Sequence, residues 1–180
     1  MHAPLETKFR HFDSDLSLKD GALIAGYASL FDSCDDGGDT VNRGAYGASL
    51  SRLQSLGRSI KMLWQHDATQ PIGVWDEVRE DTKGLYVCGR LLLEVQAARE
   101  AHALLKAGAI DGLSIGYRTV RSEKSSSGGR ILHEINLWEV SLVTFPMLSD
   151  ARVQAAPSQE EEDLAESLAA TFRQARASLA

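Results

Sequence analysis

The segment GLSIG, residues 112–116, places a serine between two glycines in the G-x-S-x-G pattern of nucleophilic serines. In this pattern the glycines keep bulk away from a hydroxyl that a substrate carbonyl must approach. A five-residue match is weak on its own, because a strand that packs closely against another segment also favours small residues. Ser114 is therefore a candidate nucleophile whose surroundings have to decide its role.

The residues around Ser114 predict a strand. An α/β-hydrolase elbow needs a strand before the serine and a helix after it, whereas here a helical pattern precedes the serine and the strand-like YRTVRSE follows. In a strand, Ser114, Gly116 and Arg118 share one face, and the apolar residues between them share the other. We therefore expect the serine to point away from the apolar side.

A serine nucleophile needs a base, and His66 is the candidate among five histidines. It ends the apolar run MLWQ and precedes a turn that we expect Pro71 to close, so it lies where a hydrophobic segment leaves the core. A core-edge histidine bonded to a backbone carbonyl is the alternative interpretation.

The base needs an acceptor that holds its ring, and Glu139 is the strongest candidate. It lies inside LWEVSLVTF, where a carboxylate is costly unless it is paired or hydrogen-bonded. Alternatively, Glu139 lies on the solvated face of an edge strand or forms an ion pair with an arginine. Asp67 is a weaker candidate for this acceptor. It adjoins His66 in the sequence, and neighbouring side chains point apart in an extended chain.

The composition is that of an ordinary soluble globular domain. The chain has 180 residues, 43% hydrophobic residues and a net charge of −6, which predicts one domain and no attraction to nucleic acid or to an acidic membrane. No apolar run approaches the roughly 18 residues of a membrane span, and the charged opening MHAPLETKFRHF is unlike a secretory signal. Two cysteines suit a reducing compartment. The acidic residues at 32–39 lack EF-hand spacing and predict a solvated turn.

Apolar periodicity and turn residues predict an α+β fold whose body is an antiparallel sheet or barrel. Strands are expected at residues 7–11, 21–31 and 60–67, in a hairpin over 72–93 that turns at 81–84, and in a long hairpin over 112–146 with a polar tip. Helices are expected at 46–56 and 94–107, and in an acidic-to-basic tail after Pro157.

Four segments in order, over about residues 5–150, resemble the tailed-phage prohead protease family, which is related to the herpesvirus assembly protease. They are GYASLFDSCDDGGDTVNRGAYGASL, MLWQHD with PIGVW, DGLSIGY, and LWEVSLVTFPML. Four ordered segments are far more specific than any one of them.

The resemblance implies a mostly antiparallel β-barrel surrounded by helices, like the herpesvirus protease. It implies a protease domain over residues 1–156, and makes the helical tail 157–180 a candidate targeting or self-cleaved segment. It also implies that Ser114 is the nucleophile, His66 the base and Glu139 the third member. The herpesvirus relatives use a second histidine, so His133 is a rival. The oxyanion donors would be backbone amides near the second hairpin, assisted by one of two arginines of the long hairpin, Arg118 or Arg130.

The function that the resemblance implies is a serine endopeptidase of capsid maturation, from a phage, a prophage or a gene transfer agent. It would cleave the scaffold, or a scaffold-like amino-terminal region of the major capsid protein, and also itself. It would act inside the assembling procapsid in the bacterial cytoplasm. The implied partners are those capsid and scaffold proteins, with a second copy of the chain as a further candidate, and no metal or organic cofactor is implied. A serine esterase or amidase, and an inactive capsid-binding or scaffold-binding module, are the alternatives.

Overall fold

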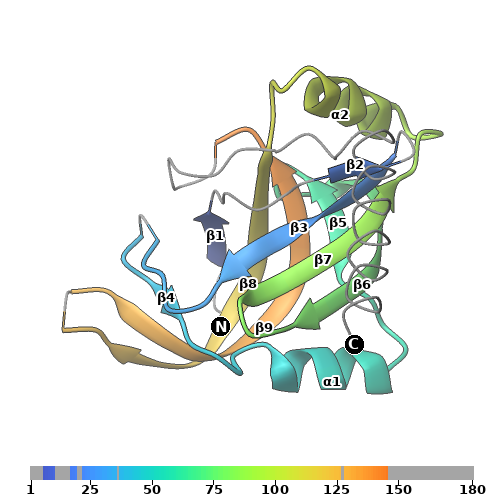
Figure 1. Ribbon diagram of the computed structural model, residues 1–180. Helices are drawn as coiled ribbons and strands as arrows, with labels where there is room; N and C mark the ends of the chain where they lie inside the picture. The colour runs from blue at the N-terminus through green and yellow to red at the C-terminus, as the bar shows by residue number, and fades with distance from the viewer. Residues whose placement is uncertain (1–5, 11–16, 20–21, 36, 127, 146–180) are drawn as a thin grey trace, which may run out of the picture.

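Nine strands and two helices make up the part of the chain that the computed structural model describes (Figure 1). It describes residues 6–10, 17–19, 22–35, 37–126 and 128–145, so the expected tail helix lies outside the described residues. The elements are β1 Glu6–Arg10, β2 Ser17–Lys19, β3 Leu23–Leu30, β4 Thr40–Val41, α1 Gly47–Ser55, β5 Lys61–Trp64, β6 Asp67–Glu80, β7 Gly84–Leu91, α2 Gln96–Lys106, β8 Gly112–Lys124 and β9 Arg130–Val143. The two hairpins, the strand at 21–31 and both helices confirm the sequence predictions to within a few residues, except that β6 begins earlier than expected.

All nine strands belong to one curled sheet in the order β1-β8-β9-β5-β6-β7-β3-β2, with β4 also paired to β9. The curl brings β3 into contact with β8 across the hydrophobic core (Figure 1). Within the described residues β1 and β2 end this order without pairing to each other, so the expected barrel is corrected to a half-barrel that stays open. The two described helices pack against it and do not surround it.

The sheet is mixed, because β9 pairs in parallel with both β5 and β4. Its other partner, β8, is antiparallel. The half of β9 after Trp138 is buried throughout, including Glu139 and Ser141, as expected for a strand that is covered on both faces. The sequence predicted antiparallel hairpins, and the parallel pairs connect segments too far apart in the chain for local patterns to reveal them.

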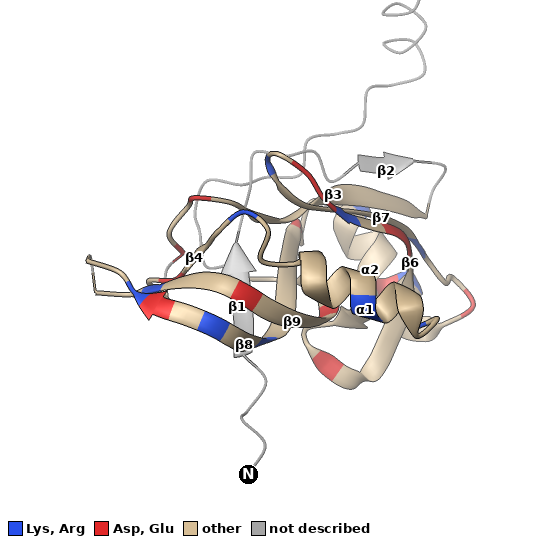
Figure 2. Cartoon of the chain, turned by 90° about the horizontal axis from the view of Figure 1, so that it is seen from below, with Lys and Arg blue, Asp and Glu red and all other residues tan. Residues whose placement is uncertain are grey.

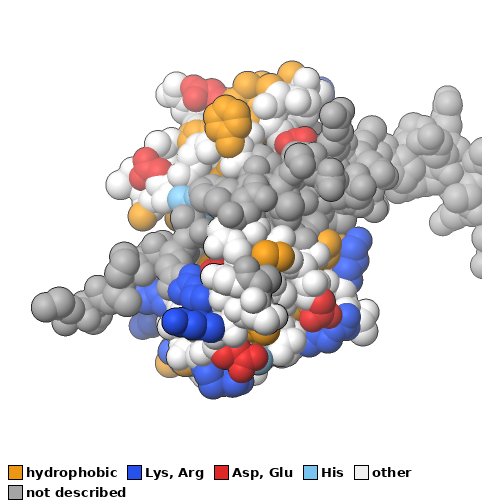
Figure 3. Space-filling model, turned by 90° about the vertical axis from the view of Figure 1, so that its left-hand side faces the viewer, with side chains coloured by type: hydrophobic (Ala, Val, Ile, Leu, Met, Phe, Trp, Pro, Cys, Tyr) orange, Lys and Arg blue, Asp and Glu red, His pale blue; other side chains and the backbone are white. Residues whose placement is uncertain are grey.

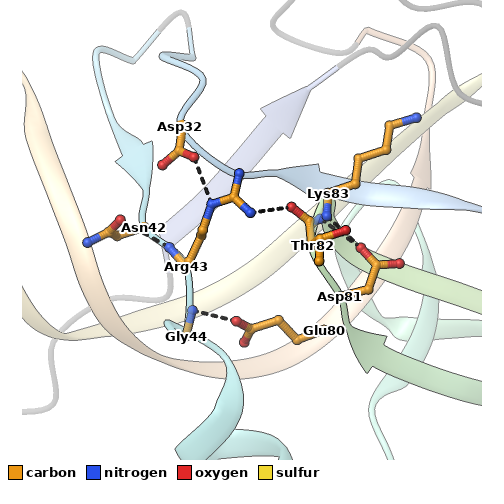
Figure 4. Close-up of polar contacts among 9 residues, drawn as sticks. Asp32, Asn42, Arg43, Gly44, Glu80, Asp81, Thr82 and Lys83 are labelled. Carbon is orange, nitrogen blue, oxygen red and sulfur yellow. Dashed lines mark hydrogen bonds and ion pairs between the residues drawn. The ribbon is translucent and has the colours of Figure 1, made fainter.

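A carboxylate from the sheet stabilises the start of α1. Glu80 accepts hydrogen bonds from the backbone N–H groups of Gly44 and Tyr46, which precede the helix. Figure 4 shows the bond from Gly44. Arg43 extends this contact between the loop and β6–β7, donating to Asp32 at 3.0 Å and to the Thr82 carbonyl oxygen at 2.6 Å. A negative charge at a helix N-terminus is favourable, and here it comes from β6 because α1 has no side-chain cap of its own.

The second helix is packed through small residues. Ala98, Ala101 and Leu105 of α2 are buried. Leu104 is 37% exposed, and several apolar residues just before the helix are similarly exposed. Figure 3 shows hydrophobic side chains at the upper end of the face it draws, the end at which α2 lies in Figure 1.

Acidic and basic residues are interspersed along the described part of the chain, notably along the β8–β9 hairpin (Figure 2). Some of the expected acidic turn is buried, because Asp39 is 7% exposed and forms an ion pair with Arg130 at 2.6 Å. Asp35 is equally buried, so the prediction of a solvated turn is wrong for both Asp35 and Asp39. No helix in the described part of the chain is long and apolar enough to cross a membrane.

The turn between β6 and β7 depends on Asp81. Its carboxylate accepts hydrogen bonds from two backbone N–H groups of the turn, from the Tyr27 hydroxyl and from Arg79. Burial alone would raise the pKa of Asp81, but these bonds outweigh it and lower the pKa from 3.8 to about 2. The stability that this carboxylate contributes is complete above pH 3.8 and is lost as the pH falls through that value towards 2.

We therefore expect Asp81→Asn to lower the melting temperature at neutral pH and to flatten its dependence on pH. Between about pH 5 and pH 2 the melting temperature of the wild type should fall further than that of the variant. Asp76→Asn, at an exposed residue of β6, is the matched control. Parallel curves for the wild type and Asp81→Asn, followed by circular dichroism, would contradict this account.

Candidate active site

A tight turn between β5 and β6 positions His66. Trp64 and Asp67 are register partners, so Gln65 and His66 alone form the connection, with φ of 52° and 62°. Positive φ at both central residues is what a type I′ hairpin turn requires, and histidine tolerates it better than most residues. The turn expected near Pro71 is therefore wrong: Pro71 lies within β6, opposite Leu63, where the register is irregular.

The structure brings together the three predicted site residues. His66 Nε2 lies 2.7 Å from Ser114 Oγ, and His66 Nδ1 lies 2.5 Å from Glu139 Oε1. Ser114 has no exposed surface, and the side chains of His66 and Glu139 are 11% and 4% exposed. The imidazole therefore connects a hydroxyl to a carboxylate in a site that largely excludes water.

Strand register explains this convergence. Ser114 of β8 faces Ser141 of β9, and Gly116 faces Glu139. On the other side of β9, Ser141 is the parallel partner of Leu63, so β5 delivers His66 just past the level of the serine. Two neighbouring strands and the turn after a third thus supply the three groups.

Ser114 is less open than its alternating pattern predicted. Both faces of β8 are buried from Gly112 to Tyr117, whereas we expected the serine face to point away from the packed side. The reason is that His66 and Glu139 themselves cover this face. The buried polar groups satisfy one another, so a serine can lie there without facing solvent.

Gly116 makes room for the acid. A Cβ atom at this position would overlap Oε1 of Glu139, and the next atoms it would meet belong to the same side chain. The second glycine of G-x-S-x-G therefore admits the carboxylate that contacts His66, whereas the sequence suggested a role in admitting substrate. A neighbouring β-bulge, where the register shifts between Gly116 and Tyr117, lets Trp138 and Glu139 lie on the same side of the sheet.

Ser141 is a further member of the site that the sequence analysis missed. The His66 backbone N–H donates to Ser141 Oγ at 3.2 Å, and the Ser141 hydroxyl donates to Glu139 Oε2 at 2.5 Å. It therefore holds both the turn that carries the base and the second oxygen of the acid. Its position two residues after Glu139, on the same face of a strand, was the signal available in the sequence.

Ser141→Ala should lower the turnover of a nitrophenyl ester by about tenfold, because one or two hydrogen bonds that fix the acid and the base are lost. Ser141→Thr keeps the hydroxyl and should restore most of the activity. The low-field NMR resonance of the proton between His66 Nδ1 and Glu139 should shift in the alanine variant alone. An unshifted resonance with full turnover would show that Ser141 only fills space.

His133 lies elsewhere on β9. Its Nδ1 is 3.1 Å from Asn42 Nδ2, and its Nε2 is 3.2 Å from Glu123 Oε1. It precedes Glu139 by six residues, which is about 20 Å along a strand. The geometry therefore favours Glu139 over the rival as the partner of His66.

The two arginines considered as oxyanion helpers are separated by the structure. Arg130 is bound to Asp39 through two hydrogen bonds of 3.0 and 2.6 Å, and pairs with Lys124 at the far end of β8. Lys124 is ten residues from Ser114, about 30 Å along the strand, so assistance from Arg130 is excluded. Arg118 is on the strand face of Ser114, and its guanidinium carbon lies 4.6 Å from the Trp138 ring centre.

This arrangement is suited to nucleophilic acyl transfer. The Ser114 hydroxyl can pass its proton to His66 Nε2 as the oxygen attacks a carbonyl, while the Glu139 carboxylate stabilises the imidazolium. Among the described residues no group of three or more His, Cys, Asp and Glu side chains is arranged to hold a metal ion.

Comparison with known proteins agrees with this chemistry. The family model for caudovirus prohead serine proteases matches residues 10–166. The prohead protease of Enterobacteria phage HK97 is 33% identical over 139 residues, which cover 76% of this chain and 60% of that protein. The prohead protease of Escherichia phage T5 is 26% identical over 164 residues, covering 90% and 75% of the two chains.

Two further similarities are more limited. The capsid polyprotein of Pseudomonas phage PAJU2 is 32% identical over 114 residues, which cover 59% of this chain and 17% of that protein. The structure of the bacteriophage T4 capsid assembly protease superimposes with a TM-score of 0.62 at 16% identity, covering 79% of this chain and 98% of that chain. This last likeness concerns the fold alone. The chain spans about 60% of the length of the HK97 protein.

Proposed function

Because this chain belongs to the caudovirus prohead serine protease family, we propose that it is a serine endopeptidase with Ser114, His66 and Glu139 as its catalytic triad. The observation that carries the proposal is the continuous contact from Ser114 Oγ through His66 to Glu139, with distances of 2.7 and 2.5 Å. A buried serine whose hydroxyl served only packing would not need a histidine that is itself held by a buried carboxylate.

In the proposed reaction Ser114 Oγ bonds to the carbon of a peptide carbonyl while His66 Nε2 takes the hydroxyl proton. The imidazolium then gives that proton to the leaving amine nitrogen as the peptide bond breaks, which leaves an acyl ester on Ser114. Water repeats both steps and releases the acid. Glu139 stabilises the imidazolium in both halves of the reaction.

The proposed substrate is the scaffold, or the scaffold-like amino-terminal region of the major capsid protein, inside the assembling procapsid. The names of the HK97 and T5 relatives support a role in the prohead, and the similarity to a capsid polyprotein supports an association with capsid protein. The compartment would be the cytoplasm of the bacterial host.

Self-cleavage is a further part of the proposal. The small-residue stretch at 153–158, which the sequence suggested for self-cleavage, lies outside the described residues.

The proposal is tested by co-expressing the chain with the capsid protein encoded beside it and measuring the intact mass of both proteins. We expect a discrete loss of mass from the capsid protein, and a second loss from the protease itself. Hydrolysis of small chromogenic esters with no trimming of either protein would instead identify an esterase or amidase. No reaction with either substrate would identify a binding module.

A further inference from the structure

Arg118 and Trp138 form a cation and aromatic pair beside the triad. The guanidinium carbon of Arg118 is 4.6 Å from the centre of the Trp138 ring, and the indole is 46% exposed. The backbone of Arg118 is level with Asn136, whereas Trp138 adjoins Glu139. The arginine side chain therefore leans along the sheet towards the catalytic end.

The guanidinium has unused hydrogen-bonding capacity. Arg118 Nε is buried from solvent, and among the described residues no acceptor contacts it and no carboxylate pairs with this arginine. A buried donor without an acceptor costs free energy, and the cost is larger for a charged group. Stacking on an indole fixes the plane of the guanidinium and leaves its edge to receive a planar, negatively charged group.

The acid next to Trp138 in the chain, Glu139, is not available to Arg118, because one of its oxygens is bound to His66 and the other to Ser141. Among the described residues Arg118 therefore has no acidic partner, and a substrate bound beside Ser114 would bring one.

We propose that Arg118, seated on Trp138, binds the carboxylate of an aspartate or glutamate in the substrate. The inference rests on the proposed function, because it takes Ser114 as the point of cleavage. Ser141 marks the level of Ser114, and Trp138 lies three residues before it on β9, about 10 Å along the strand. In an extended peptide that distance places the acidic residue about three positions from the scissile bond.

Arginine fits this role better than lysine, because its parallel N–H groups match the two oxygens of a carboxylate. Partial burial strengthens the contact, since water competes less for the charge. The pair would thus act as a specificity subsite, which selects substrates without taking part in bond breaking.

The test uses the full-length protein and a peptide digest of denatured bacterial protein, with cleavage products identified by mass spectrometry. For the wild type we expect Asp or Glu to be enriched at one fixed position near the cut. A pair of synthetic peptides that differ only in Glu or Gln at that position should then differ at least tenfold in kcat/KM, about 1.4 kcal/mol.

In Arg118→Gln the ratio between the two peptides should fall to near one, and Arg118→Lys should give an intermediate ratio. Arg121→Gln, an exposed arginine on the same strand, is the matched control and should keep the wild-type ratio. The comparison of the Glu and Gln peptides is first made with the wild-type enzyme. The acidic preference itself can therefore be measured whether or not a variant folds.

Three results would overturn the inference. The first is cleavage by the wild type with no preference for Asp or Glu near the cut. The second is a preference for an acidic residue that persists in Arg118→Gln. Either result would leave the proposed function intact. Failure of the wild type to cut either the peptides or the co-expressed capsid protein overturns the proposed function and the inference with it.

Discussion

Ser114→Ala is expected to reduce proteolysis by at least about 10⁴-fold, so that capsid protein and protease both keep their full mass on co-expression. Only one oxygen is removed, from a fully buried position flanked in the strand by Leu113 and Ile115, so the fold should be retained. Ser51→Ala, which removes an exposed hydroxyl from α1, is the matched control and should process normally.

The readout for Ser114 is the intact mass of both proteins, together with labelling by a fluorophosphonate probe. In the wild type the probe should add once, through a bond from Ser114 Oγ to phosphorus with loss of fluoride, and it should not add to the alanine variant. Normal trimming by a correctly folded Ser114→Ala protein would show that another group is the nucleophile.

Glu139→Gln is expected to lower kcat by roughly 10² or more. The amide keeps the shape of the side chain but removes the negative charge that stabilises the His66 imidazolium. Loss of the corresponding charge in the serine-protease template costs about 10⁴. His133→Gln should be nearly silent, because that ring contacts Asn42 and Glu123 at the other end of β9.

Two outcomes of the comparison between Glu139→Gln and His133→Gln would contradict the assignment of Glu139. A large loss in His133→Gln with a silent Glu139→Gln would make the histidine the third member of the triad and Glu139 a structural residue. Two silent variants would leave Ser114 and His66 working without a third side chain. Turnover of a nitrophenyl ester, measured at saturating substrate, distinguishes these cases.

Local patterns marked three residues as candidates, and the family resemblance combined them into one site. Ser114 stood between glycines, His66 ended an apolar run, and Glu139 interrupted another apolar run. Each of these signals depends on a few adjacent residues, and the structure brings all three side chains into contact. The long hairpin of β8 and β9 was equally local, because its polar tip separates two strand-like segments.

Pairing between distant segments could not be predicted in this way. The parallel contact of β5 with β9 joins residues 78 positions apart, such as Lys61 and Glu139, and no turn sequence records it. The turn at Gln65 and His66 lacks the Asn-Gly sequence typical of a type I′ hairpin. The sequence therefore predicted the turn near Pro71 instead. The roles of Gly116 and Ser141 follow from register, which only the assembled sheet defines.

The place of β9 in the sheet also sets when the proposed active site can form during synthesis. β9 is the last described strand in the chain, yet it lies between β8 and β5 and carries the acid that contacts His66. A growing chain that ends before residue 139 has its serine and its histidine but lacks both the acid and the strand that holds them together. Long-range pairing of this kind forms late. The proposed triad therefore cannot assemble until nearly all of the described fold has left the ribosome.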